Sequence, residues 1–112
     1  MVQHSPQLDA TFGAFADSSR RTIIERLGRG PATISQLAEL LSITLTGTKK
    51  HVQVLEDAGL VTTDKVGRTR ICRLGPRRLD RELAWIESYG QHLDERLDRL
   101  GELVEKRQGE SK

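Results

Sequence analysis

The chain has 112 residues, one cysteine and a formal net charge of +2, which suits a single domain with a modest core. One cysteine excludes an intramolecular disulfide, and no apolar run approaches the roughly 20 residues that a membrane span needs. The polar N-terminus does not suit a signal peptide, so we expect a cytoplasmic protein without a membrane partner.

The charge is unevenly distributed along the chain. Residues 1–43 carry four basic and four acidic side chains, whereas residues 44–78 carry eight basic and three acidic ones, a net charge of +5. Residues 79–112 have a net charge of −3. The basic middle third favours a polyanionic partner, with a patch that only improves solubility as the alternative.

The first predicted helix follows a flexible tail at residues 1–7. Leu8, Phe12 and Phe15 recur at helical spacing and predict a helix over residues 8–16. The two phenylalanines therefore belong to a core or to a subunit interface.

Two more short helices are predicted before residue 44. Asp17 is a suitable N-cap for a helix over residues 18–27. Thr33 and Gln36 fit a capping box, in which each side chain satisfies a free amide of the other residue. The helix that follows has an apolar stripe of Leu37, Leu40 and Leu41.

A fourth helix with a cap at each end is predicted within residues 44–59. Thr44 can cap its N-terminus, and Gly59 suits the left-handed position after its C-terminus. Helical spacing predicts an inward face of Leu45, Thr48, Val52 and Leu55. The outward face carries Thr46, Lys49, Lys50 and Gln53. Such a face can enter a DNA major groove, with lysine on phosphate or guanine and glutamine on adenine, or it is an ordinary solvated face.

The period changes to that of strands after the fourth helix. Residues 60–63 are rich in β-branched side chains, residues 70–74 are a second strand candidate, and Gly67 suits a hairpin turn between them. The tip of the hairpin carries three cations, Lys65, Arg68 and Arg70. A helix-turn-helix followed by a basic hairpin is a winged helix, whose hairpin would lie along the phosphate backbone.

Residues 76–108 predict one long helix, with Pro76 in its first turn and a flexible tail at residues 109–112. Its apolar residues alternate at spacings of four and three, interrupted at Gly90. They are Leu79, Leu83, Ile86, Leu93, Leu97, Leu100 and Val104. These residues form an apolar seam along the helix, which a domain this small cannot cover. We therefore expect a homodimer that packs mainly through this helix, with help from the first helix and Phe12.

The predicted fold is therefore mainly α (α+β), a winged helix-turn-helix in the order ααααββα. The DNA-binding core covers residues 8–75, and the dimerisation helix covers residues 76–108.

Several stretches carry a family pattern. They are Ala-Asp-Ser-Ser-Arg-Arg at residues 16–21, Lys-His-x-x-x-Leu-x-x-Ala-Gly-Leu-Val at residues 50–61, and the wing at residues 66–70. Residues 16–76 thereby resemble the arsenic-repressor (ArsR) family of winged-helix transcription regulators. Trp85 and residues 95–100 are similar to a subgroup described as lacking metal. The resemblance implies a homodimeric repressor of an inverted-repeat operator near its own or an adjacent gene.

The best-known effectors of the family that the chain resembles are metals and arsenicals. The residues that could ligate them therefore decide whether such an effector is expected. Thiolate sensing would need cysteines on the third helix, and residues 33–43 contain none. Cys72 lies on the second predicted strand, where we expect a packed apolar group, with oxidation as the alternative.

The other familiar metal site pairs Asp-x-His with His-x-x-Glu on the last helix. His92 and Glu95 supply one half, but residues 80–82 lack the histidine, so we expect no metal and no cofactor. The alternative is a metal-responsive repressor whose inter-subunit site recruits His4 and Asp9.

No enzyme motif is present, and we expect no catalysis. Trp85 and Tyr89 lie one turn apart, which indicates interface packing, or a small-molecule pocket as the alternative. His51 is expected to pack or to lie beside phosphate. A winged-helix module that binds protein remains a second hypothesis, and the sequence identifies no effector.

Overall fold

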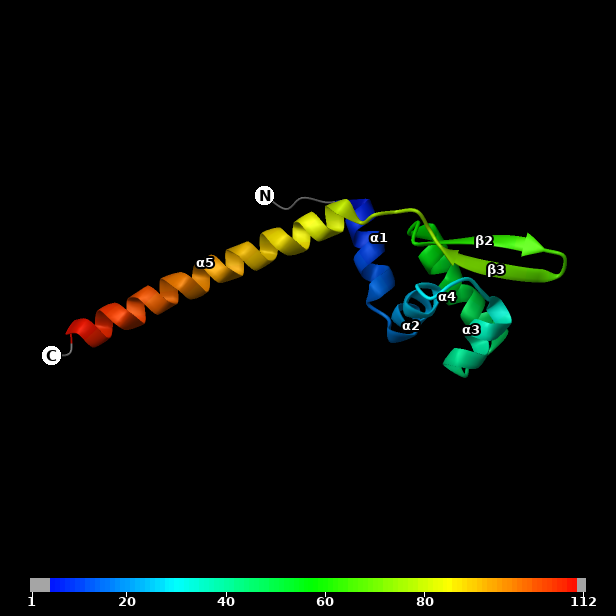
Figure 1. Cartoon of the computed structure of the whole chain (residues 1–112), viewed down its shortest axis with the longest axis horizontal. Coiled ribbons are helices and arrows are strands. Elements are labelled where there is room, and N and C mark those ends of the chain that lie inside the picture. The colour runs from blue at the N-terminus through cyan, green and yellow to red at the C-terminus, as the bar shows by residue number, and fades with distance from the viewer. Residues whose placement is uncertain (1–4, 111–112) are drawn as a thin grey trace. The chain divides into compact units, whose positions relative to one another are not determined.

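The computed structural model describes residues 5–110, and the side chains of residues 5–106. The helices and strands, in chain order, are α1 Pro6–Phe15, α2 Ser18–Leu27, β1 Ala32–Thr33, α3 Ile34–Leu41, α4 Leu45–Asp57, β2 Val61–Val66, β3 Thr69–Leu74 and α5 Asp80–Glu110 (Figure 1). They confirm a mainly helical winged helix-turn-helix with a long C-terminal helix. The chain divides into a first unit that ends at Arg78 and a second unit that begins at Leu79.

The first unit has a core of its own. Side chains from α2, α3, α4 and the β2–β3 hairpin meet in it. Its fully buried members include Ile23, Leu37, Leu55, Val61 and Cys72. Burial of this apolar surface is the main force that holds the helices against the hairpin.

The predicted helix caps are all present. The Asp17 carboxylate accepts from the backbone N–H of Arg20 at 3.1 Å, and Thr44 Oγ1 accepts from the N–H of Gly47 at 3.0 Å. The capping box is complete, because Thr33 Oγ1 accepts from Gln36 N–H at 3.1 Å and Gln36 Oε1 accepts from Thr33 N–H at 2.9 Å. These bonds satisfy amide groups that the first turn of a helix leaves unpaired.

The sheet has one strand more than predicted. β2 and β3 form the expected antiparallel hairpin, and Gly67 at its turn has φ +65°. The extra strand β1 pairs with β3, and the strand order is β1-β3-β2. β1 joins the wing to the residues just before α3, so it fixes the hairpin beside the helix-turn-helix.

The boundaries of two helices, α1 and α5, differ from the predictions. α1 begins at Pro6, inside the expected tail, because Ser5 caps it by accepting from Leu8 N–H at 3.3 Å. α5 begins at Asp80 instead of near Pro76, and it ends at Glu110, so residues 109–110 of the expected tail are helical. Arg77 donates to Ala58 O and to Thr11 Oγ1, which holds the segment before α5 on the first unit in a non-helical conformation.

Two leucines predicted to face inward do not. On α3 the buried residues are Ile34, Leu37 and Ala38, and Leu40 lies off that face with 47% of its surface exposed. On α4, Thr48, Val52 and Leu55 are buried as predicted, but Leu45 is 50% exposed.

The second unit consists of the single helix α5. Its seam residues Leu83, Ile86, Leu93, Leu97, Leu100 and Val104 are each between 45% and 57% exposed in the isolated chain. None of the described helices is long and apolar enough to cross a membrane. His4 and residues 111–112 lie outside the described residues.

Candidate nucleic-acid interface

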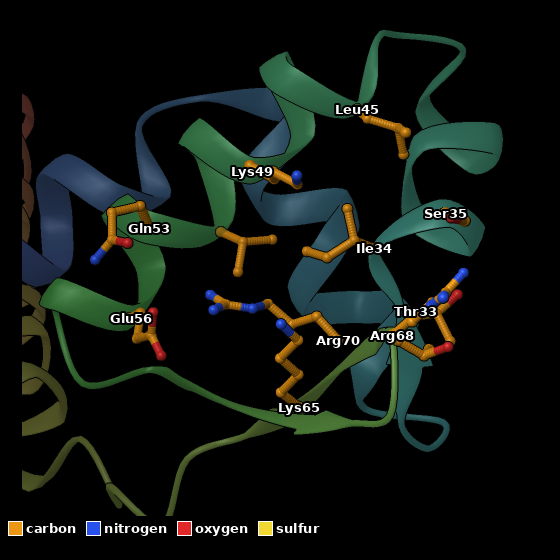
Figure 2. A pocket seen from close by; sticks show the side chains of 12 residues that line it. Thr33, Ile34, Ser35, Leu45, Lys49, Gln53, Glu56, Lys65, Arg68 and Arg70 are labelled. Atoms are coloured by element: carbon orange, nitrogen blue, oxygen red, sulfur yellow. The ribbon is translucent and has the colours of Figure 1, made fainter.

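A groove of about 730 Å³ lies between α4, the start of α3 and the β2–β3 hairpin (Figure 2). Five of the seven predicted DNA-contacting residues line it: Lys49, Gln53, Lys65, Arg68 and Arg70. The first two come from α4 and the other three from the hairpin. Residues that were predicted on separate elements therefore line one basic groove.

Thr46 and Lys50, the other two predicted contacts, do not line this groove. Both are exposed on α4, on the side that continues the outward face beyond Gln53. A helix that enters the major groove can present both sides of such a face.

The hairpin brings like charges together. Lys65 is the cross-strand partner of Arg70, and Arg68 follows Gly67 in the turn. Like charges at directly opposed positions destabilise a sheet, and a bound anion would offset the repulsion. By contrast, Arg73 outside the groove lies 3.7 Å from the carboxylate of Asp64.

Gln53 and Glu56 are held by neighbours. Gln53 Nε2 donates to Asp57 Oδ1 at 2.8 Å, which orients the amide and leaves its oxygen and one N–H for a base edge. Glu56 Oε2 accepts from Thr63 Oγ1 at 2.8 Å. This bond ties α4 to β2 and fixes one edge of the groove.

Arg20 of α2 connects α4 to α1 through its side-chain hydrogen bonds. The sequence did not predict this role. Arg20 Nε donates to Ala14 O at 2.8 Å and its Nη2 to Gly13 O at 3.1 Å, while its Nη1 donates to His51 Nδ1 at 3.3 Å. His51 therefore packs against α2 and does not line the groove. The backbone N–H of Arg20 holds the pKa of the Asp17 carboxyl below its usual value.

Cys72 is fully buried on β3, opposite Ala32 and Thr63. Burial, followed by the charge of Glu56, raises the pKa of its thiol to about 11. A neutral buried thiol is a poor nucleophile and a poor metal ligand, in line with the expectation of a packed apolar group.

The predicted weak metal ligands, His92 and Glu95, lie on α5. His92 Nδ1 donates to Ser88 O at 2.7 Å, and both His92 and Glu95 are exposed on α5. Among the described side chains, no three histidine, cysteine, aspartate or glutamate residues gather as a metal site requires.

The aromatic pair on α5 stacks. The rings of Trp85 and Tyr89 are parallel, with centroids 5.9 Å apart, and both side chains are more than half exposed. They remain candidates for an interface or for a ligand contact.

Comparison with known proteins agrees with this architecture. A helix-turn-helix domain family matches residues 15–64. The HTH-type transcriptional regulator Rv2034 of Mycobacterium tuberculosis is 33% identical over 94 residues, which cover 77% of this chain and 88% of that protein.

Two solved structures are similar over most of their length. A crystal structure of an ArsR family transcriptional regulator has a TM-score of 0.74 and 37% identity, covering 84% of this chain and 97% of that one. An ArsR-like regulator from Rhodococcus sp. RHA1 has a TM-score of 0.73 and 31% identity, covering 89% and 92%. The sequence matches and the shared fold show that the chain belongs to the ArsR family of DNA-binding, winged helix-turn-helix transcriptional regulators.

Proposed function

We propose that this chain acts as a homodimeric, sequence-specific repressor on an inverted-repeat operator, without an obligatory metal. The observation that carries the proposal is the basic groove, in which Lys49 of α4 faces the cations of the hairpin (Figure 2).

The groove suits the edge of a DNA duplex. The major groove of B-DNA is about 12 Å wide and admits one helix, which would be α4. Lys65, Arg68 and Arg70 would then contact the phosphates that border it. The four groove cations of each chain are Lys49, Lys65, Arg68 and Arg70. If each neutralises one phosphate, a dimer makes eight phosphate contacts, and the logarithm of the affinity falls with the logarithm of the salt concentration at a slope of about −7.

The exposed seam of α5 supports the dimer. Residues spaced by four and three along a helix form a stripe that packs well against another such stripe. A second copy of the chain would supply the matching stripe. The twofold symmetry of such a dimer would then set its two grooves against the two halves of a palindromic site. Phe12 on α1, half-buried within the first unit, is proposed to assist.

Selection from a random duplex library in the presence of EDTA tests the proposal. We expect the purified protein to enrich an inverted repeat. In fluorescence anisotropy, Lys49→Ala combined with Arg68→Ala should weaken binding and reduce the salt slope by roughly 3 to 4. Arg73→Ala is the matched control, because Arg73 lies outside the groove. Absence of any enriched sequence would favour the protein-binding alternative, and an unchanged double variant would exclude this surface.

Metal independence has its own test. Zinc, nickel or arsenite added to the protein–operator complex should change affinity by less than tenfold. An effector can shift binding only by its preference for one state of the protein, and tenfold corresponds to about 1.4 kcal/mol. A larger change that disappears in His92→Ala would contradict the proposal.

A further inference from the structure

Leu45 is a large, exposed apolar side chain in a groove that also carries four cations, Lys49, Lys65, Arg68 and Arg70. It occupies the first position of α4, is 50% exposed, and lines the groove together with Ile34, Ser35 and Lys49. In Figure 2 it lies at the end of the hollow near Ser35, with Gln53 and Glu56 at the other end of α4.

Leu45, Lys49 and Gln53 form one file along α4. They are spaced by four residues, so they share a side of the helix and span about 12 Å at a rise of 1.5 Å per residue. Successive base pairs are about 3.4 Å apart, so the file covers three to four base pairs. It offers an apolar group, an ammonium group and an amide, in that order.

These groups match different features of the major groove. Lysine suits phosphate or the acceptors of guanine, and glutamine suits the donor and acceptor of adenine. The exposed apolar feature on a base edge is the C5-methyl group of thymine, and apolar side chains are its usual partners.

We infer that Leu45 determines operator specificity by packing against the C5-methyl group of a thymine, three to four base pairs from the base that faces Gln53. The inference rests on the proposed DNA-binding function. Contact between the leucine and the methyl removes apolar surface of both from water, whereas cytosine or guanine at that position places polar groups against the leucine.

Replacing thymine by uracil isolates the contribution of this methyl, because uracil lacks only that group. Burial of one methyl-sized group changes affinity by about fourfold, so removal from both half-sites should weaken wild-type binding by about 10- to 15-fold. Leu45→Ala should bind the thymine and uracil operators equally. Leu45→Met keeps an apolar side chain and should retain the preference. Leu40→Ala is the matched control, because Leu40 is equally exposed but lies outside the groove.

Library selection completes the test. The wild type should enrich thymine at one position of each half-site, and Leu45→Ala, checked for folding by circular dichroism, should lose enrichment there alone. The inference is overturned if an operator is enriched but no thymine-to-uracil change affects wild-type binding, or if Leu45→Ala keeps the full preference. Failure to enrich any sequence overturns the proposed function together with the inference.

Discussion

The two units of the chain use apolar residues in opposite ways. In the first unit Ile23, Leu37 and Leu55 are fully buried, and the core is complete within one chain. In α5 the seam residues, such as Leu97, are about half exposed. A small domain can close a core around short helices, but a 31-residue helix reaches beyond any such core. We therefore expect the first unit to fold by itself, and we propose that α5 depends on a partner chain.

The charges follow the same division. Residues 44–78, which build the groove, have a net charge of +5, and residues 79–112 have a net charge of −3. A negative helix is repelled by phosphate, which favours the first unit over α5 as the DNA-binding surface. Variants in each unit should have separable effects.

The largest effect is expected from Leu97→Glu. A carboxylate in the apolar seam would be buried without a partner when two chains pair, at a cost of several kcal/mol. Light scattering at micromolar concentration should then show a monomer with an intact first unit. Gln91→Glu, which adds the same charge on an exposed position off the seam, should remain dimeric. A monomeric wild type would contradict the proposed dimer.

Leu55→Ala should destabilise the first unit by about 2–5 kcal/mol, because it leaves a cavity at a fully buried site. Urea unfolding measured by circular dichroism should show the loss at every protein concentration. Leu97→Ala, the matched change in α5, should lower stability only where the wild type is dimeric. A concentration-independent loss in Leu97→Ala would place that residue in a core of its own chain.

Lys65→Glu should separate stability from DNA binding. It replaces the like-charge pair with Arg70 by an opposite-charge pair, which stabilises a hairpin by about 0.2–1 kcal/mol. The same change should weaken operator binding, because a carboxylate then lies near phosphate. Thermal unfolding and anisotropy on one preparation test both effects. A variant less stable than the wild type would show that the groove cations do not repel each other.

The smallest effect concerns Cys72. Its folded pKa of about 11 lies above the ordinary thiol pKa of 9.0, so the folded state holds the proton more tightly. The corresponding stability is present below pH 9 and is lost as pH rises towards 11. The wild type should therefore lose more stability than Cys72→Ala between pH 8 and 10.5 in urea unfolding. Equal losses would mean that the thiol is not protected by burial.

The sequence predicted the elements of the first unit well, because their ends carry specific chemistry. Asp17, Thr33 and Thr44 cap helices as predicted, and Gly59 has the expected positive φ of 75°. It did not predict β1, since two residues have no period and their pairing with β3 is a long-range contact.

Side-chain environment at the edges of elements was harder to predict. Leu45 fits the inward spacing of α4, but the groove, which depends on where the hairpin packs, leaves it exposed. Pro76 is a good first-turn residue, yet Arg77 is bonded to Ala58 and Thr11, so the helix starts later. The candidate site was partly predictable, because its cations cluster in sequence, whereas the support that Arg20 gives to α4 arises only in the fold.

The stoichiometry of the protein–operator complex tests the central claim most directly. Native mass spectrometry or analytical ultracentrifugation of the selected duplex, at concentrations well above the dissociation constant, counts the chains bound. The account predicts two chains per inverted repeat, with Leu97→Glu binding more weakly as single chains. One wild-type chain per duplex at full affinity, or full affinity in Leu97→Glu, would contradict it.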